Sequence, residues 1–181
     1  MSARLRTPWF RTDAGVARRR DVQERSRWRT RLTPRSIILV RAETGEISPK
    51  SLASVVSSFQ AVPDPMQRYR QLLFMAKTLT PVQAERLCDM YKVPGCVSQV
   101  WIIPSLKDGL VYYDAESDAL LTKGLAALLI KALSGNSPEE ISSVTPNFIA
   151  DLGLKSALTP SRTNGLLNML SLMQNQARSF L

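Results

Sequence analysis

The sequence predicts an α+β fold in which a small antiparallel β-sheet packs against several α-helices. Two short runs rich in strand-forming residues flank the turn residues Lys107-Asp108-Gly109, which predicts a single β-hairpin. Most of the chain around this hairpin, from about residue 48 onward, has apolar residues at helical spacing. Because an isolated hairpin is only marginally stable, the helices have to cover it and complete the core.

Two helices are predicted ahead of the hairpin, and each begins where a capping residue precedes a proline. Ser48-Pro49 starts the first helix, whose apolar residues share one face up to Phe59. Asp64-Pro65 starts the second helix. We expect its buried stripe to comprise Met66, Tyr69, Leu72, Leu73 and Ala76, and its outward face to comprise Arg68, Gln71 and Lys77.

A third, shorter helix and two strands are predicted next. The helix runs from Thr80-Pro81 to about residue 91 and contains Cys88. The first strand covers residues 97–103 and should end at Pro104, since proline cannot donate a ladder hydrogen bond. The second strand covers residues 110–114.

The helix predicted over residues 119–133 is apolar almost all round, which places it at the centre of the fold. Ser117 or Asp118 would cap its start, and Gly135 would end it.

Three helices are predicted after this central one. A capping box at residues 137–140 opens a short helix, and another short helix is expected near residues 146–152. The last helix begins at Ser161, and its inner face comprises Leu166, Leu170, Met173, Ala177 and Phe180.

The positive charge is confined to the start of the chain. Residues 1–41 hold 12 arginines and three acidic residues, which accounts for the whole net charge of +9. The balanced remainder has no bulk electrostatic reason to bind nucleic acid or an anionic membrane. An arginine-rich start with few acids is typical of an organelle transit peptide. We therefore expect residues 1–45 to be a disordered transit peptide and residues 46–181 to form one domain.

The residue types exclude several classes of chemistry. The chain has no histidine and only two cysteines, Cys88 and Cys96. Ser-His and Cys-His couples are therefore excluded, and so are a four-cysteine zinc site and a C-x-x-C redox pair. No apolar run reaches the roughly 18 residues of a membrane span. We expect no metal site and no membrane association.

Cys96 follows the turn residues Pro94-Gly95 and precedes an apolar, β-branched run, so its thiol would be presented at a fixed place. This pattern alone fits a small buried side chain more often than a reactive thiol, because free cysteines are commonly buried.

The wider motif resembles a known family. Residues 92–101 (KVPGCVSQVW) resemble the active-site segment of the SufE family, the sulfur-acceptor partners of cysteine desulfurases in iron–sulfur cluster assembly. The resemblance runs from about Leu52 to the C-terminus. It includes, in the same order, residues 63–69 (PDPMQRY), 117–128 (SDALLTKGLAAL) and 158–162 (LTPSR). KVPGCVSQVW and the run ending in Asn164-Gly165 point to the cyanobacterial and plastid branch.

This resemblance implies a SufE/IscU-like fold and a role as a sulfur acceptor. Cys96 would take persulfide sulfur from a SufS-type cysteine desulfurase, stimulate that enzyme and pass the sulfur to a SufBCD-type scaffold. Pyridoxal phosphate would belong to the desulfurase, so this chain itself would bind no cofactor. The chain would be a monomeric or homodimeric transfer partner, rather than a stand-alone enzyme, and would bind no nucleic acid.

Four further residues are candidates for support of Cys96. Arg162, in the first turn of the last helix, opposes the helix dipole; it either lies near Cys96 and favours its thiolate, contacts the desulfurase, or is simply solvated. Asp118 is either a helix cap or a neighbour of the active loop. Gln99 either hydrogen-bonds along the Cys96 loop or occupies a core or edge position. Lys123 either snorkels to solvent or meets the partner.

Alternative interpretations concern Cys88 and the basic start of the chain. Cys88 is expected on an apolar helix face; alternatively, it is a resolving thiol that forms a disulfide with Cys96. The alternative functions are accordingly a thiol redox sensor and a nucleic-acid-associated protein that uses its basic arm. The expected location is the plastid (chloroplast stroma), with the mitochondrion as the alternative.

Overall fold

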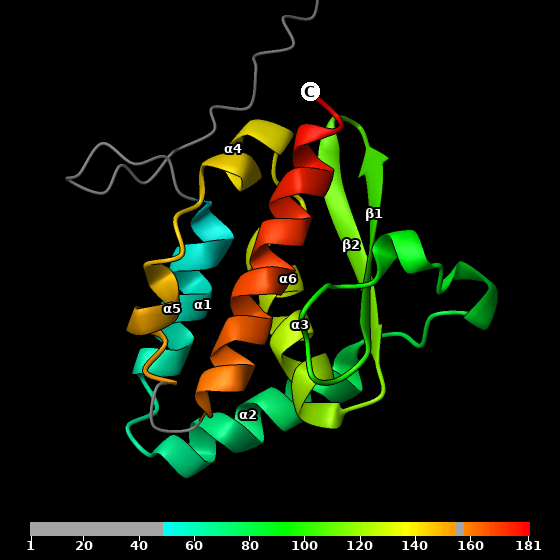
Figure 1. Ribbon diagram of the computed structural model, residues 1–181. Coiled ribbons are helices and arrows are strands. Elements are labelled where there is room, and N and C mark those ends of the chain that lie inside the picture. Colours follow the sequence, from blue (N-terminus) through cyan, green and yellow to red (C-terminus); the bar gives the residue numbers. More distant parts are fainter. Residues whose placement is uncertain (1–48, 155–157) are drawn as a thin grey trace, which may run out of the picture. The chain divides into compact units, whose positions relative to one another are not determined.

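The computed structural model describes residues 49–154 and 158–181, and within them the predicted α+β class is confirmed (Figure 1). A two-stranded antiparallel sheet packs against helices. The helices and strands are α1 (Lys50–Gln60), α2 (Pro65–Thr78), η1 (Ala84–Arg86), η2 (Asp89–Tyr91), β1 (Val100–Lys107), β2 (Leu110–Ser117), α3 (Leu120–Leu133), α4 (Pro138–Ser143), α5 (Phe148–Asp151) and α6 (Pro160–Arg178). The predicted transit peptide, the domain boundary near residue 45 and the Ser48 cap lie outside the described residues.

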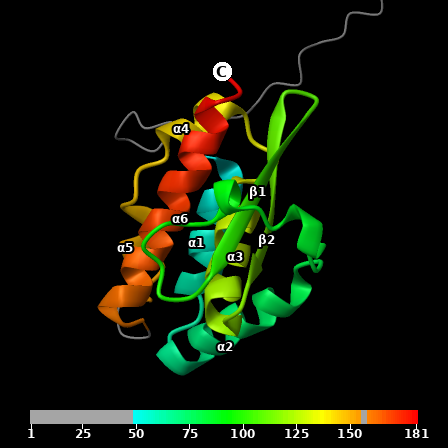
Figure 2. The same cartoon turned by 45° about the vertical axis from the view of Figure 1, so that its right-hand side comes forward.

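Helix α3 is the centre of the domain, as its apolar sequence predicts. It contacts both strands and the helices α1, α2 and α6, and in Figure 2 the hairpin runs in front of it. Gly124 permits the close approach of α2, because a Cβ at this position would overlap the carbonyl oxygen of Leu72. Gly135 follows the helix with a φ of 78°, which confirms its role in ending the helix.

The hairpin differs from its predicted bounds at both ends. β1 begins at Val100 rather than at residue 97, and it continues through Pro104, which pairs with Tyr113. Val100 directs its carbonyl oxygen away from β2, toward the N–H of Val93. Pro104 lies four residues further along the strand, so it faces the same outer side, where the ladder needs no donor. The prediction that proline ends this strand is therefore wrong.

The segment predicted as a third helix forms the two 3₁₀ turns η1 and η2 instead. Nearly all its side chains are exposed, so an α-helix here would have no apolar face to bury, and helices this short depend on such packing. The segment is held to the outer face of the sheet by an ion pair of 2.8 Å between Arg86 and Asp114. The N–H of Val82 also donates to the carboxylate of Glu116 over 3.3 Å.

Helix α2 begins at the predicted Asp64 cap, whose carboxylate accepts from the N–H of Met66. Its faces are partly reversed from the prediction. Met66 is 57% exposed, whereas Arg68 turns inward. The Arg68 side chain donates to the carbonyl oxygens of Phe59 and Val62 and to that of Gly153, so it joins the ends of α1 and α5.

The remaining helices follow the sequence closely. The capping box between Ser137 and Glu140 is present at the start of α4. Two hydrogen bonds of 2.8 Å fix α6 against the sheet: the Tyr113 hydroxyl donates to the carbonyl oxygen of Met173, and the Gln176 amide donates to that of Ile102. These bonds set the position of the helix that carries one side of the candidate site.

Candidate functional site

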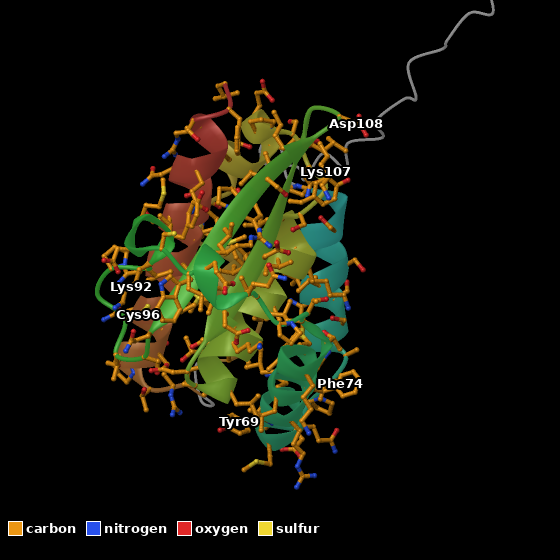
Figure 3. All side chains as sticks on the ribbon, turned by 90° about the vertical axis from the view of Figure 1, so that its right-hand side faces the viewer. Tyr69, Phe74, Lys92, Cys96, Lys107 and Asp108 are labelled. Atoms are coloured by element: carbon orange, nitrogen blue, oxygen red, sulfur yellow. The ribbon has the colours of Figure 1, made fainter. Side chains whose placement is uncertain are left out.

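Cys96 lies at the tip of a short loop that a backbone pairing closes. The N–H of Val93 donates to the carbonyl oxygen of Val100 over 2.9 Å, and Lys92 forms an isolated bridge with Trp101. Residues 94–99 therefore project as a loop from a closed neck. Figure 3 labels Lys92 and Cys96 on this part of the chain, away from the hairpin tip at Lys107 and Asp108 and from Tyr69 and Phe74 on α2.

Helix α6 holds this loop through two contacts. The Asn168 amide donates to the carbonyl oxygen of Pro94 over 3.1 Å, and the Cys96 thiol donates to that of Gly165 over 3.7 Å. Both glycines at the contact serve close packing. Gly95 has a φ of 69°, and a Cβ there would lie 3.0 Å from the Asn168 amide nitrogen. A Cβ on Gly165 would lie 3.3 Å from the Cys96 sulfur.

The Cys96 thiol is half-buried, and this burial raises its pKa above the ordinary value. The positive charge of Arg162 does not offset this effect of burial on the pKa of Cys96. At neutral pH the thiol is therefore mostly protonated in this conformation. Because the thiolate is the nucleophile, the site holds Cys96 in its less reactive form.

A cavity of about 320 Å³ adjoins the Cys96 sulfur. We call it the Cys96 cavity. It is lined by Cys96, Val97, Ser98, Ala119, Leu121, Thr122, Leu125, Thr159, Ser161, Arg162, Gly165 and Met169. Apolar side chains and hydroxyl groups predominate, and Arg162 is the single charged lining residue among the described ones.

Arg162 occupies the first turn of α6, as predicted, and the structure brings it to the same cavity as Cys96. Its side chain is exposed. Within residues 49–154 and 158–181 its guanidinium has neither an ion-pair nor a hydrogen-bond partner. Its positive charge is therefore available to a bound group at the mouth of the cavity.

Gln99 and Lys92 tie the base of the loop together. The Lys92 ammonium donates to the Gln99 side-chain oxygen over 3.3 Å and lies 5.6 Å from the centre of the Trp101 ring. The Gln99 carbonyl oxygen accepts from the Ser117 hydroxyl and from the N–H of Asp118, over 2.7 and 3.2 Å. Gln99 thus hydrogen-bonds at the Cys96 loop, and its backbone connects that loop to the start of α3.

Asp118 lies next to this connection, but its side chain does not cap the helix. Ala119 is the N-cap residue of α3, and no side chain supplies a cap hydrogen bond. The nearby Ser117 hydroxyl accepts instead from the N–H of Ala119, one residue before the helix. The predicted capping role of Asp118 is therefore wrong, and its exposed carboxylate stays a candidate for contact with a partner.

Lys123 forms an ion pair of 2.6 Å with Glu116 and is only 15% exposed, so it does not snorkel to solvent. Burial by itself would raise the pKa of Glu116. Hydrogen bonds from Lys123 and from the N–H groups of Ser117 and Val82, together with the Lys123 charge, nevertheless lower that pKa overall. The ion pair therefore joins β2 to α3, and the hydrogen bond from Val82 attaches the segment before η1 to the same carboxylate.

Cys88 is exposed and lies directly before η2, so it is not the helix-face apolar residue that the sequence predicts. Its sulfur lies 3.7 Å from the carbonyl oxygen of Glu85, and it does not line the Cys96 cavity. Its role as a resolving thiol stays a prediction.

The structure adds two residues that the sequence did not single out as site residues. Asn168 borders the apolar stripe of α6, so its position in the sequence does not mark it as a site residue. The available signal is its spacing, because a residue three positions after Gly165 lies on the same helix face. Lys92 lies within the recognised motif, but its contact with Gln99 and Trp101 depends on the pairing at the loop neck, which residue spacing alone does not predict.

The Cys96 sulfur borders a cavity in which an electrophile can bind, so the arrangement permits nucleophilic attack once the thiol has lost its proton. The cavity has no lining carboxylate, so no acidic side chain of the described residues is placed to remove the thiol proton there. No group of three or more potential metal ligands occurs in the part of the chain that the structure describes. None of the described helices has the length and apolar character needed to cross a bilayer.

The chain is similar to several known proteins. Residues 53–177 match the family model described as "Fe-S metabolism associated domain", SufE. A SufE-like protein of Synechocystis is 49% identical over 73% of this chain and 83% of its own length. "SufE-like protein 1, chloroplastic/mitochondrial" of Arabidopsis thaliana is 50% identical over 73% of this chain. "Cysteine desulfuration protein SufE" of Plasmodium vivax is 36% identical over the same share.

A solved structure shares the fold. The solution structure of a hypothetical protein from Thermus thermophilus has a TM-score of 0.64 and 27% sequence identity, and the match covers 74% of this chain and 97% of that one. The chain spans only 36% of the length of the Arabidopsis relative and 54% of that of the Plasmodium relative. The family model covers the Cys96 loop, the cavity and nearly all of α6. The chain belongs to the SufE family, on the branch that includes the cyanobacterial and plant relatives.

Proposed function

We propose that this protein is a sulfur acceptor in iron–sulfur cluster assembly, with Cys96 as the sulfur carrier. The observation that carries the proposal is the half-buried Cys96 thiol, held at a loop tip beside an open cavity. The family's association with iron–sulfur metabolism supports it. The name of the Plasmodium relative, a cysteine desulfuration protein, supports a cysteine desulfurase of the SufS type as the partner.

The proposed step is an exchange at sulfur. The Cys96 thiolate attacks the outer sulfur of a persulfide on the desulfurase, and the sulfur–sulfur bond of that persulfide breaks. A persulfide forms on Cys96, and the desulfurase cysteine leaves as a thiolate that takes up the proton given by Cys96. The transfer needs no cofactor on this chain, because the carbon–sulfur cleavage belongs to the partner. Removal of the sulfur from the partner stimulates its turnover, and a SufBCD-type scaffold then receives the sulfur.

Mass mapping of the two cysteine peptides tests this proposal. After incubation with a SufS-type desulfurase and cysteine, we expect the mass of one sulfur atom to be added at Cys96 and not at Cys88. The variant Cys96→Ser should neither gain sulfur nor stimulate the desulfurase, whereas Cys88→Ser should behave like the natural chain. Full stimulation by Cys96→Ser would exclude covalent transfer as the mechanism.

Arg162→Ala should slow the transfer while leaving the free energy of unfolding unchanged.

We also propose that residues 1–45 direct the protein to the plastid. The arginine-rich composition of that segment and the chloroplastic/mitochondrial name of the Arabidopsis relative support an organelle. A fusion of residues 1–45 to a fluorescent protein should locate to chloroplasts in plant cells. Mitochondrial fluorescence would favour the alternative organelle, and diffuse or nuclear fluorescence would remove the targeting role.

A further inference from the structure

Among the described residues, the Cys96 cavity has one positively charged lining residue and no negatively charged one. Acceptance of sulfur from a protein donor does not require this charge. One guanidinium, that of Arg162, is the only charged group in its lining as described. The lining also includes Ser98, Thr122, Thr159 and Ser161, each of which carries a hydroxyl group. A site that offers one cation, several hydroxyl donors and no carboxylate favours an anionic group, and guanidinium and carboxylate form strong, geometrically specific pairs.

The cavity is also small. Its volume of about 320 Å³ is at the lower end of the range for small-molecule sites. Apolar side chains such as Leu121, Leu125 and Met169 line it, so it can accept the carbon–sulfur part of a ligand while the polar rim takes the charge. An amino-acid-sized molecule matches this volume better than a folded protein segment does.

We propose that the Cys96 cavity binds a low-molecular-weight persulfide that bears a carboxylate, and that Cys96 accepts sulfur from it directly. Cysteine persulfide is the simplest member of this class. Arg162 would hold the carboxylate, and the outer sulfur would reach the Cys96 sulfur across the cavity. The inference rests on the proposed acceptor role of Cys96 but adds a small-molecule donor to the protein donor.

The step balances without an oxidant or a reductant. The Cys96 thiol gives up its proton, and its sulfur bonds to the outer sulfur of the small persulfide. The sulfur–sulfur bond of the donor breaks, and the donor leaves as the carboxylate-bearing thiolate, which takes up a proton. One sulfane sulfur moves, and the sum of oxidation states is unchanged.

Cys88 provides an internal control for the experiment, because it is exposed and does not line the cavity. The full chain is exposed briefly to cysteine persulfide or to its methyl ester, which lacks the negative charge. Mass mapping then gives the ratio of sulfur added at Cys96 to sulfur added at Cys88. We expect this ratio to be about fivefold higher for cysteine persulfide, which is the upper effect of one ion pair with an exposed guanidinium.

Variants of α6 complete the test. Arg162→Gln should remove the preference for the carboxylate, and Arg162→Lys should retain part of it. Arg178→Gln is the matched control, because Arg178 lies in the last turn of the same helix and contacts Asn175, outside the cavity. Labelling at Cys96 should also saturate with persulfide concentration, whereas labelling at Cys88 should rise linearly.

Equal ratios for the two probes, or a ratio unaffected by Arg162→Gln, would overturn the inference. A parallel reaction with the desulfurase separates this failure from that of the proposed function. If the desulfurase loads Cys96 while the small persulfides show no carboxylate preference, only the small-molecule donor is excluded. If neither donor loads Cys96, the acceptor role fails as well.

Discussion

The Cys96 thiol is partly shielded from solvent but borders an open cavity. Its half-burial raises its pKa and favours the neutral thiol, which limits reaction with oxidants and adventitious electrophiles. Transfer requires the thiolate, so a donor has to reach the cavity, or the loop has to shift, before Cys96 reacts at its full rate. Two hydrogen bonds join the loop to α6 among the described residues, and a shift of the loop away from the helix would have to break them.

The raised pKa of Cys96 gives a prediction for its alkylation by iodoacetamide in the Cys88→Ser variant. Because burial disfavours the thiolate, the pH at which the rate is half-maximal should lie above the ordinary thiol value of 9.0 and return to it in urea. The folded state favours the neutral thiol, so this contribution to stability is present below pH 9 and is lost as the pH rises further. A midpoint at or below 9.0 in the folded protein would contradict this account.

At the scale of single residues, the sequence placed Cys96 directly after a Pro-Gly turn and Arg162 in the first turn of the last helix, and the structure brings both to one cavity. It did so because a Pro-Gly turn and a helix start are local features that neighbouring residues determine. It could not predict that Lys123 pairs with Glu116, or that Asn168 holds the loop. Those contacts join residues from different elements, and only the tertiary packing brings them together.

At the scale of elements, the errors share a physical cause. Residues 97–99 have strand-forming character, yet Val97 is 88% exposed in the loop because no partner strand extends beside it. The segment that forms η1 and η2 has helical composition, but it has no apolar face that packing could bury. Local propensity decides neither case, since strands and short helices both depend on a neighbour. The central helix and the capped helices were predicted well because their signals lie within the element.

Two glycines lie at close contacts between elements, Gly124 where α3 meets α2 and Gly165 where α6 meets the Cys96 loop, and they lead to a paired prediction. Alanine at position 124 should lower the free energy of unfolding by about 1–3 kcal/mol, because its Cβ meets backbone that cannot move alone. Gly165→Ala is the matched control within a helix. Its Cβ meets only the Cys96 sulfur, so stability should be kept or raised by up to about 1 kcal/mol. Its sulfur acceptance should fall instead, because the thiol is displaced.

Urea denaturation of both variants, with persulfide loading measured alongside, distinguishes the two roles. If Gly124→Ala proves as stable as Gly165→Ala, the close approach of α2 and α3 does not account for the glycine. If Gly165→Ala loads sulfur at the normal rate, the contact between Cys96 and α6 has no bearing on transfer.

At the scale of the whole molecule, the class of fold was predictable from one hairpin signal and one fully apolar helix. The contacts that join the ends of the helices were not predictable from the sequence. Arg68 lies in a recognised motif, and its sequence position suggests a solvent-facing charge. In the structure it binds the carbonyl groups at the ends of α1 and α5. Gly153 at this junction has a φ of 63°, and a Cβ there would overlap the Arg68 guanidinium, so both its backbone conformation and its packing favour glycine.

The hairpin has a consequence for how the domain meets other chains. A sheet of only two strands exposes two rims, and such rims invite foreign strands to add on and propagate into aggregates. Here the rim of β1 is occupied by Val93 and by the Gln176 amide, and it carries a proline that offers no donor. The rim of β2 is occupied at Val111 by Gly135 and Asn136. These contacts hinder the addition of a further strand at either rim and so limit strand-to-strand aggregation.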